Sequence, residues 1–473
     1  MGKGAFVSAA WHHPGPSERA SGRASGRAAA AGGRRPATAT GSRPEKRLAR
    51  PTYGGAVLSV LSARDFRLLW LSQTASVIGD ALVLVAVGLF VTRLTGDPSD
   101  VGLVLVAYSL PLVLLVLLGG VVADRLPRQR VMVVSDVVRA VLHGTLAVLI
   151  VTGAVRVWHM VVIGLLFGTA EAFFRPAYTG LVPQTVGEEQ IQSAQALTGV
   201  SREVAEVVGP ALATALVLGV GGAAAFALDA ATFVVSALLL WRVRGRDRGE
   251  PAQRASVGRE LAEGWQAVRE RTWVWATILA FSVALMTALA PFFVLGASIA
   301  DEVYGSDAVY GLANAAWGVG TVCGAVVGSR WRPRHPMRAA VLCAVPWPLC
   351  LAVFALGPAL PVLFAAMAVA GVGIGLFAVW WETALAQRVP PHLLSRVSAW
   401  DWMGSLLLLP LGYLLAGPLA ERVGGPELLA AGGLVGTAVM TLALLPRATR
   451  DLARLDPAGT SAPVDPRVPV GTT

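Results

Sequence analysis

The sequence is poor in charge and in cysteine. Charged residues make up 14% of its 473 residues, whereas a soluble domain carries roughly 25%. The cysteines, Cys323, Cys343 and Cys350, all lie inside apolar stretches. They offer neither a disulfide framework nor a metal-ligand spacing, so we expect them to act as small packing residues. The low charge excludes an ordinary soluble domain.

Motifs of common enzymes are missing as well. The sequence contains no phosphate-binding loop, no pair of catalytic carboxylates on a soluble segment and no nucleophile–histidine pattern. The histidines are too scattered for a metal site: His12, His13, His143, His159, His335 and His392. We therefore expect no enzyme, no metal and no cofactor. No apolar core of sufficient length follows the basic start, so no signal peptide is expected.

Long apolar stretches dominate what is present. Hydrophobic residues make up 55% of the chain, and a helix needs about 20 mostly apolar residues to cross a bilayer. The stretches predict an all-α transmembrane fold of twelve helices in two sets of six. The predicted helices cover residues 68–92, 101–123, 131–153, 157–176, 195–219 and 223–243, then 273–297, 308–329, 337–357, 359–382, 398–420 and 427–446.

Polar segments divide the chain into five parts. We expect a disordered cytoplasmic tail over 1–64, six-helix halves over 65–243 and 273–446, a cytoplasmic linker over 244–272 and a cytoplasmic tail over 447–473. In the linker, Leu261, Trp265 and Val268 share one face of a predicted helix. This pattern indicates either an amphipathic helix on the inner membrane surface or a helix whose apolar stripe packs on protein.

The positive charge follows a regular distribution. The net charge is +10, and the only lysines are Lys3 and Lys46, so nearly all of the basic residues are arginine. Arginine-rich turns, such as 125–130, 242–248 and 330–338, alternate with turns nearly free of basic residues. By the positive-inside rule, we expect both termini and the linker in the cytoplasm. The charge thus indicates membrane topology rather than nucleic-acid binding, and the arginine bias favours a bacterial inner membrane.

The second half of the chain repeats the first. GTAEAFFRPAYTGLVP at 168–183 aligns with GLFAVWWETALAQRVP at 375–390, so that Gly168 meets Gly375. At nearly the same offset, Gly209 meets Gly417. Because an even number of spans returns the chain to the same side, the repeat is parallel, and an axis along the membrane normal is expected to relate the halves. This architecture is typical of alternating-access transporters, with the substrate path between the halves.

The turn GVVADRLPRQR at 120–130 closely resembles the signature between helices two and three of the major facilitator superfamily. Segments such as IGDALVLVAVGLFV and FRPAYTGLVPQTV are similar to the branch that contains the enterobactin exporter and macrolide efflux proteins. The resemblance covers about residues 64–446. It implies that the turn is a conformational latch, with the residues Gly120, Asp124, Arg125 and Arg128. The alternative is a topology signal without a switching role.

Charged groups inside apolar helices need a reason, since each costs roughly 2.5–3.5 kcal/mol at a helix centre. Asp80 lies midway along the first helix and has no arginine within one turn. It is our leading candidate for proton or cationic-substrate binding, and the alternative is a structural hydrogen bond. Arg202 and Glu206 share one face of the fifth helix and form either a structural salt bridge or a gate. Gly209 and Pro210, which resemble the core of the superfamily's antiporter motif, predict a kink.

Further charges lie near the predicted inner ends of helices. Asp136 and Arg139 are expected to form a local pair that completes the latch, and Asp401 is a candidate partner for it. The i, i+4 spacing on the fourth helix and the internal repeat predict an inner gate between the halves. Its candidate residues are Glu171, Arg175 and Glu382.

Together these features predict a secondary active transporter that exports small amphipathic molecules, drug-like or siderophore-like, by proton antiport with alternating access. Because no nucleotide-binding domain is visible, the energy must come from an ion gradient. The expected partners are a small-molecule substrate, protons and the lipid bilayer, with no nucleic acid, and the expected state is a monomer. The alternatives are an importer or facilitator of the same fold, or a non-transporting membrane partner or sensor.

The predicted topology can be checked by labelling a single cysteine at Ser256 in a cysteine-free background. The linker is expected in the cytoplasm, so an impermeant reagent should label this cysteine only after the cells are opened. A cysteine placed in the arginine-poor turn 301–308 serves as the control that is labelled from outside. Labelling at position 256 in intact cells would contradict the topology.

Overall fold

The computed structural model describes residues 60–244 and 257–454. Every regular element in these two ranges is helical. The tail expected over 1–64 lies, up to residue 59, outside the described residues, as do residues 245–256 of the linker and the chain beyond residue 454.

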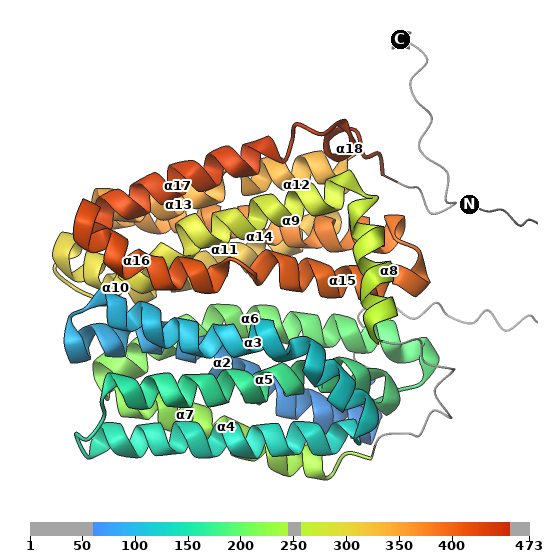
Figure 1. The fold of residues 1–473 in the computed structure, drawn as a ribbon, viewed down its shortest axis with the longest axis horizontal. Coiled ribbons are helices and arrows are strands. Elements are labelled where there is room, and N and C mark those ends of the chain that lie inside the picture. Colours follow the sequence, from blue (N-terminus) through green and yellow to red (C-terminus); the bar gives the residue numbers. More distant parts are fainter. Residues whose placement is uncertain (1–59, 245–256, 455–473) are drawn as a thin grey trace, which may run out of the picture. The chain divides into compact units, whose positions relative to one another are not determined.

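The first six membrane helices form the part of the fold coloured blue to green (Figure 1). They are α2 (Arg64–Thr95), α3 (Pro98–Arg125), α4 (Arg128–Val151), α5 (Val157–Thr185), α6 (Ile191–Gly219) and α7 (Gly222–Trp241), with the short turns η1 (Val60–Ser62) and η2 (Glu188–Gln190). Gly96 ends α2 with a φ of 71°, a conformation that costs glycine little. The Asp97 carboxylate then accepts a hydrogen bond from the Ser99 amide at 2.7 Å and caps α3.

The second six spans follow the short helix α8 (Val257–Arg269) and form the yellow to red part of Figure 1. Their elements are α9 (Thr272–Ala284), η3 (Leu285–Leu289), α10 (Ala290–Tyr304), α11 (Ala308–Arg330), α12 (Pro336–Ala344), α13 (Pro346–Val353), η4 (Phe354–Leu356), α14 (Leu360–Arg388), α15 (Pro391–Leu406), α16 (Leu409–Val423) and α17 (Gly425–Leu442). The one-turn helix α18 (Arg447–Arg450) is the last regular element of the described residues.

Three spans of the second half are interrupted within the membrane. The span Thr272–Tyr304 contains the π-helical turn η3 just before Pro291. The span Pro336–Leu356 changes helix at Pro346, and the span Arg396–Val423 does so just before Pro410. Proline lacks an amide hydrogen and clashes with the preceding turn, so each break follows from the local sequence.

Eleven helical segments of the described chain are long and apolar enough to cross a membrane. The one predicted helix missing from these eleven is the fifth, α6, whose apolar part is only Val208–Gly219. Arg202, Glu203 and Glu206 occupy the earlier turns of α6 and lower its hydropathy. The fold is therefore the expected one of twelve helices.

The repeat predicted from sequence corresponds to equivalent helix contacts in the two halves. Helices α3 and α5 pack extensively in the first half, and α11 and α14 do so in the second. A Cβ atom at Gly168 would overlap the carbonyl oxygen of Tyr108, and one at Gly375 would overlap that of Thr321. The two aligned glycines therefore have the same role, because each lets two helix backbones come into contact.

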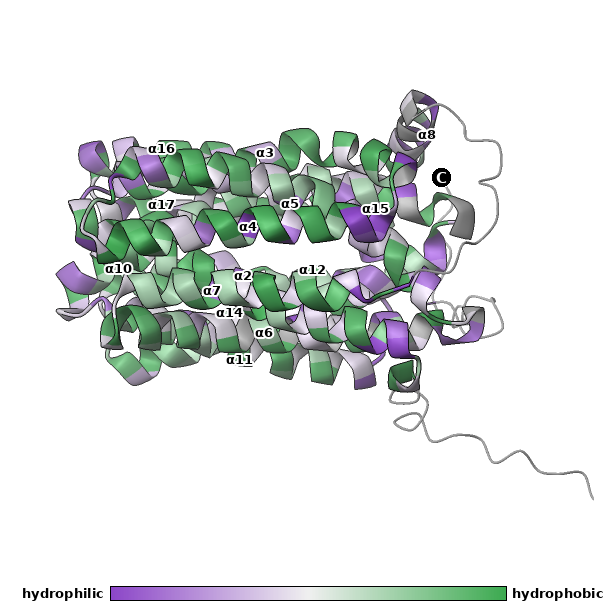
Figure 2. Ribbon diagram, turned by 90° about the horizontal axis from the view of Figure 1, so that it is seen from below, coloured by the Kyte–Doolittle hydropathy of each residue, from purple (hydrophilic) through white to green (hydrophobic). Residues whose placement is uncertain are grey.

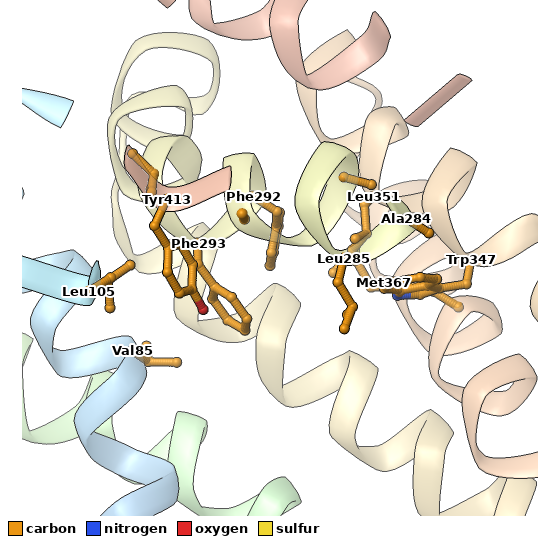
Figure 3. Close-up of a cluster of buried hydrophobic side chains, with 14 of the residues drawn as sticks. Val85, Leu105, Ala284, Leu285, Phe292, Phe293, Trp347, Leu351, Met367 and Tyr413 are labelled. Carbon is orange, nitrogen blue, oxygen red and sulfur yellow. The ribbon is translucent and has the colours of Figure 1, made fainter. Parts of the chain in front are cut away.

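The two halves meet through α6 with α11, α3 with α16, and α2 with α10. Apolar side chains fill this contact, as Figure 3 shows for Val85 and Leu105 of the first half near Phe293 and Tyr413 of the second. Glycine again allows close approach, because a Cβ atom at Gly102 would overlap the carbonyl oxygen of Tyr413.

Helix α8 packs on α15 through one face. Trp265 lies 5.0 Å from Trp400 between ring centroids, and Glu263 forms an ion pair with Arg396. Val268 is buried, whereas Trp265 stays 47% exposed. The helix thus contacts protein and also presents an apolar side chain outward, at an end of the fold where polar residues gather (Figure 2).

Two adjacent glycines of α3 test whether backbone contact holds α3 against α5 within the first half. Gly119 faces α5, where a Cβ atom would overlap the carbonyl oxygen of Ala172, whereas Gly120 has no atom within 4 Å of that position. We expect Gly119→Ala to destabilise the protein by about 1–3 kcal/mol through overpacking. Gly120→Ala should stabilise it by about 0.5–1 kcal/mol through helix propensity. Unfolding of the purified protein in detergent measures both, and equal effects would contradict the packing.

Candidate functional site

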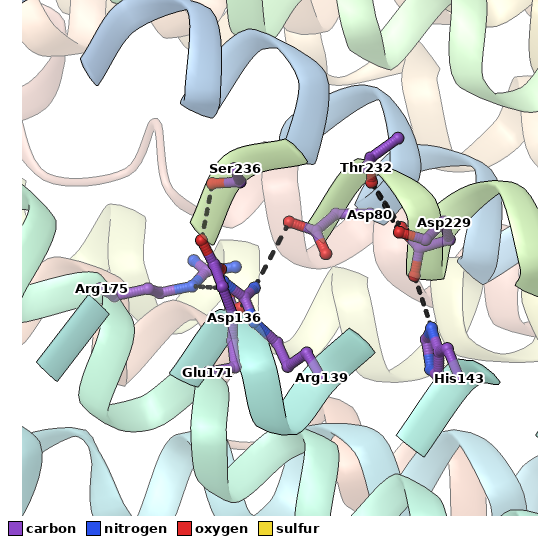
Figure 4. Close-up of polar contacts among 9 residues, drawn as sticks. All are labelled: Asp80, Asp136, Arg139, His143, Glu171, Arg175, Asp229, Thr232 and Ser236. Carbon is purple, nitrogen blue, oxygen red and sulfur yellow. Dashed lines mark hydrogen bonds and ion pairs between the residues drawn. The ribbon is translucent and has the colours of Figure 1, made fainter. Parts of the chain in front are cut away.

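A buried arginine lies at the centre of the first half. The Arg139 side chain, on α4, is fully buried. Its guanidinium donates to Asp136 Oδ1 at 2.5 Å and to Glu171 Oε2 at 2.5 Å (Figure 4). The second oxygen of Asp136 accepts a hydrogen bond from the Ser236 hydroxyl of α7 at 2.6 Å. Helices α4, α5 and α7 are thereby tied together by one charged network.

Aromatic rings also pack against the same guanidinium. Its central carbon lies 4.2 Å from the ring centroid of Phe174 and 4.3 Å from that of Phe233. Such contacts are worth about 2 kcal/mol or more when water is excluded. They let an apolar interior hold a full positive charge beside its carboxylates.

Asp80 joins this network at its edge. Its Oδ2 lies 3.8 Å from Arg139 Nη1, and its side chain is 32% exposed, unlike the buried Asp136. The sequence interpretation of Asp80 as an unpaired carboxyl is therefore wrong. Its partner lies far along the chain, on another helix, where spacing within one turn does not detect it.

Glycines position Asp80 by drawing its helix against two neighbours. A Cβ atom at Gly79 would overlap Asp229 Oδ1 of α7. A Cβ atom at Gly209 would come within 2.8 Å of the Ala81 carbonyl carbon, so α6 also touches α2 beside Asp80. Pro210 follows in a helix that runs unbroken from Ile191 to Gly219. The Glu206 side chain, proposed from sequence as a partner of Arg202, lies outside the described residues.

A second polar network, which the sequence analysis did not find, lies one turn along α4. His143 Nδ1 is 2.5 Å from Asp229 Oδ2, and its Nε2 is 3.0 Å from the Tyr108 hydroxyl. The imidazole stacks on Phe167 with centroids 4.3 Å apart. The i, i+4 spacing of Arg139 and His143 was a signal that both polar groups share one inward face of α4.

The signature turn makes contacts within its own half. Arg128 Nη1 donates to the carbonyl oxygen of Gly180 on α5 at 2.6 Å, and Arg125 is exposed. The Asp124 side chain lies outside the described residues. Asp136 and Arg139 do form the expected pair, but their further partners are side chains of α2, α5 and α7 rather than of the turn.

The predicted gate residues are arranged around a tryptophan. Arg175 Nε donates to Glu171 Oε1 at 2.7 Å, and its guanidinium carbon lies 5.0 Å from the ring centroid of Trp402. The Arg202 guanidinium lies over the same ring at 5.2 Å. No ion pair joins the described side chains of Arg175 and Glu382. The structure instead brings two arginines of the first half onto Trp402 of the second half.

Asp401, proposed as a latch partner, accepts hydrogen bonds within its own half. Its oxygens receive the Trp381 indole N–H at 2.9 Å and the Ser405 hydroxyl at 3.5 Å. Neither donor belongs to the first half.

At the opposite end of the helices the halves are in direct contact. Arg93, near the end of α2, pairs with Asp307 before α11 at 2.6 Å. The Ser99 hydroxyl at the start of α3 donates to Glu421 of α16 at 3.3 Å. Glycines bring the backbones together here too, since a Cβ atom at Gly311 would overlap the Thr214 hydroxyl.

A comparison with known families decides the class of the protein. The family described as transmembrane secretion effector matches residues 56–463. The chain belongs to this family of the major facilitator superfamily.

Known members of the superfamily resemble the chain over most of their length. The multidrug efflux pump Tap of Mycolicibacterium fortuitum is 28% identical over 363 residues, which cover 73% of this chain and 87% of that protein. Macrolide efflux protein A of Streptococcus pyogenes is 20% identical over 397 residues, 83% of this chain and 97% of that protein. The crystal structure of the nucleoside transporter NupG superposes with a TM-score of 0.62 at 12% identity, covering 80% and 98% of the chains.

These findings support the broad expectations from sequence. The protein is a multi-pass membrane transporter of the major facilitator fold, and its family and relatives are transporters rather than enzymes. A transporter of this type acts on a small-molecule substrate and lies in a lipid bilayer.

The Arg139 network generates a stability prediction with a matched control. Arg139→Met leaves the carboxylates of Asp136 and Glu171 buried without their shared cation, and should cost about 3–5 kcal/mol. Arg175→Met removes the other cation of Glu171, but that side chain is 39% exposed, so its loss should cost at most about 1 kcal/mol.

Denaturant or thermal unfolding in detergent compares the two variants. Adding Asp136→Asn to Arg139→Met should recover part of the lost stability, because one buried charge is removed. Equal destabilisation by both arginine substitutions, or no recovery in the double variant, would show that Arg139 is not the centre of the network.

Proposed function

We propose that the protein is an efflux pump that exchanges small amphipathic molecules for protons by alternating access. Asp80 is the proposed coupling group, and the observation that carries the proposal is its position. It is a partly exposed carboxylate placed 3.8 Å from a buried cation that is already bound by Asp136 and Glu171.

This geometry suits proton exchange. Three carboxylates, those of Asp80, Asp136 and Glu171, share the guanidiniums of Arg139 and Arg175, so one negative charge is in excess. Asp136 and Glu171 each make a 2.5 Å contact with Arg139, whereas Asp80 is held loosely. Asp80 can therefore take a proton, or release it, with the least disturbance of the buried network.

Contacts between the halves at both ends of the helices support alternating access. At one end, the Arg93–Asp307 pair and the contacts of Ser99 and Gly311 hold the halves together. At the other end, Arg175 and Arg202 meet Trp402. Each set is small and polar enough to separate while the other set forms, which is what a rocking movement of two halves requires.

We propose that the end containing Arg175, Arg202 and α8 faces the cytoplasm. The arginine-rich turns support this orientation. The signature turn would then be an inner latch with Gly120, Asp124, Arg125 and Arg128, and the pair of Arg128 with the Gly180 carbonyl would anchor it to α5. Glu382 would add a negative charge to the inner gate that Glu171 and Arg175 form.

The proposed substrates are drug-like amphipathic compounds. The names of two relatives, a multidrug efflux pump and a macrolide efflux protein, support this class and the outward direction. An acidic site such as Asp80 suits a cationic or basic compound, because the substrate and the proton would compete for one carboxylate.

The coupling role of Asp80 can be tested in proteoliposomes with erythromycin and ethidium as probes. With the membrane potential clamped at zero, one coupled proton supports a concentration ratio of about tenfold per pH unit. We expect Asp80→Asn to retain shape but to lose this uphill transport, because the amide cannot ionise. Asp301→Asn, at an exposed aspartate outside the network, is the matched control and should behave as the parent.

The outcomes separate the alternatives. Uphill transport by Asp80→Asn to the same concentration ratio as the parent would show that Asp80 is structural, and Glu206 would be the next carboxyl to test. If the parent protein equilibrates either probe and does not respond to the pH gradient, the protein is a facilitator. Accumulation in the opposite direction, in vesicles of known orientation, would identify an importer.

A further inference from the structure

The network of Tyr108, His143 and Asp229 lies beside the proposed coupling group, Asp80. The proposed coupling mechanism does not use it. The side chains of His143 and Asp229 are fully buried. They come from α4 and α7, and Tyr108 comes from α3. A histidine is costly in an apolar interior unless its nitrogens are satisfied, and here both ring nitrogens have a partner.

The hydrogen bonds of this network can be satisfied in two charge states. An ionised Asp229 only accepts, so the hydrogen on His143 Nδ1 points to Asp229. In the neutral imidazole, Nε2 accepts from the Tyr108 hydroxyl; in the imidazolium, Nε2 donates to the same oxygen after the hydroxyl hydrogen turns away. Uptake of one proton forms an N–H bond at Nε2, breaks no contact and changes the charge of the pair from −1 to 0.

Charged and aromatic groups from α2, α4, α5 and α7 surround His143. Arg139 lies one turn before it on α4 and is already engaged by carboxylates. From α5, the ring of Phe167 stacks on the imidazole, and Glu171 faces Arg139. From α2, Gly79 touches Asp229, and Asp80 is the next residue. The Arg139 network has one negative charge in excess, and the buried carboxylate of Asp229 adds another next to it.

We infer that His143, held between Asp229 and Tyr108, is a second proton-binding site of the transporter, coupled to Asp80. The two networks meet where Gly79 lies against Asp229, and Figure 4 shows Asp80 and Asp229 on adjacent helices there. Each network carries one negative charge in excess of its cations, so each has room for one proton. The inference rests on the proposed proton antiport for its role in transport, but the protonation itself can be measured without any substrate.

Solid-state NMR of the protein in lipid vesicles tests the site directly. The other five histidines are replaced by glutamine, so that ¹⁵N-labelled His143 is observed alone. Imidazole nitrogen shifts distinguish the two neutral tautomers and the charged form, and spectra are taken from about pH 5 to pH 9. We expect His143 to pass from the Nδ1–H neutral form to the imidazolium, and the midpoint to move when Asp80→Asn is added.

A histidine that keeps one protonation state over the whole range would overturn the inference. So would a midpoint that is the same with and without the charge of Asp80, because the two sites would then be independent. Tyr108→Phe removes the partner that can both donate and accept, and is expected to shift the midpoint while leaving the aromatic packing in place.

The role in transport is tested with the proteoliposome assay and ethidium. Two coupled protons support a ratio of about a hundredfold per pH unit, and one supports about tenfold. His143→Asn keeps a donor near the Nδ1 position for Asp229 but cannot be protonated, so the ratio should fall by about tenfold per pH unit. His159→Asn is the control, because His159 only caps the start of α5.

An unchanged ratio in His143→Asn would make His143 a purely structural group in transport. Absence of any response to the pH gradient in the parent would instead refute the proposed antiport, and the NMR titration would still decide whether His143 binds a proton.

Discussion

The structure of the first half depends on how one buried positive charge is compensated. Arg139 is fully enclosed, and its guanidinium is held by Asp136 and Glu171 and covered by two phenylalanine rings. Such an arrangement is a weak source of stability but a strong constraint, since loss of one partner leaves an uncompensated charge in a low-dielectric interior. Helices α4, α5 and α7 are therefore held in fixed positions relative to one another.

Glycine contacts bring helix backbones together both within and between the halves. Within each half, Gly168 and Gly375 let helix backbones touch over long distances. Between the halves, close glycine contacts occur at Gly102 and Gly311, and at the other end Arg175 meets Trp402. In a membrane, apolar surface alone does not favour helix association, so close packing at small residues is needed to hold the helices together.

Function, on this view, comes from groups that are only partly compensated. Asp80 sits at the edge of the Arg139 network, 32% exposed and 3.8 Å from the guanidinium. His143 bridges an acceptor and a hydroxyl that serves as donor or acceptor. Both can change charge without breaking the 2.5 Å contacts that hold the helices. The rigid part of the network and the exchangeable part are thus neighbours on the same face of α4.

The sequence by itself determined the class of protein, the twelve helices and the repeat, because apolar length, prolines and glycine periodicity are local properties. It also identified Asp80, Asp136 and Arg139 as charged residues within apolar helices, where charge is energetically costly and indicates a structural or functional role. Their partners could not be predicted, since Asp80 meets Arg139, and His143 meets Asp229 and Tyr108, only when α2, α3, α4 and α7 pack together. Likewise, local spacing could not show that Arg175 would face Trp402, because the tertiary structure sets which helix faces meet and how deeply each charge is buried.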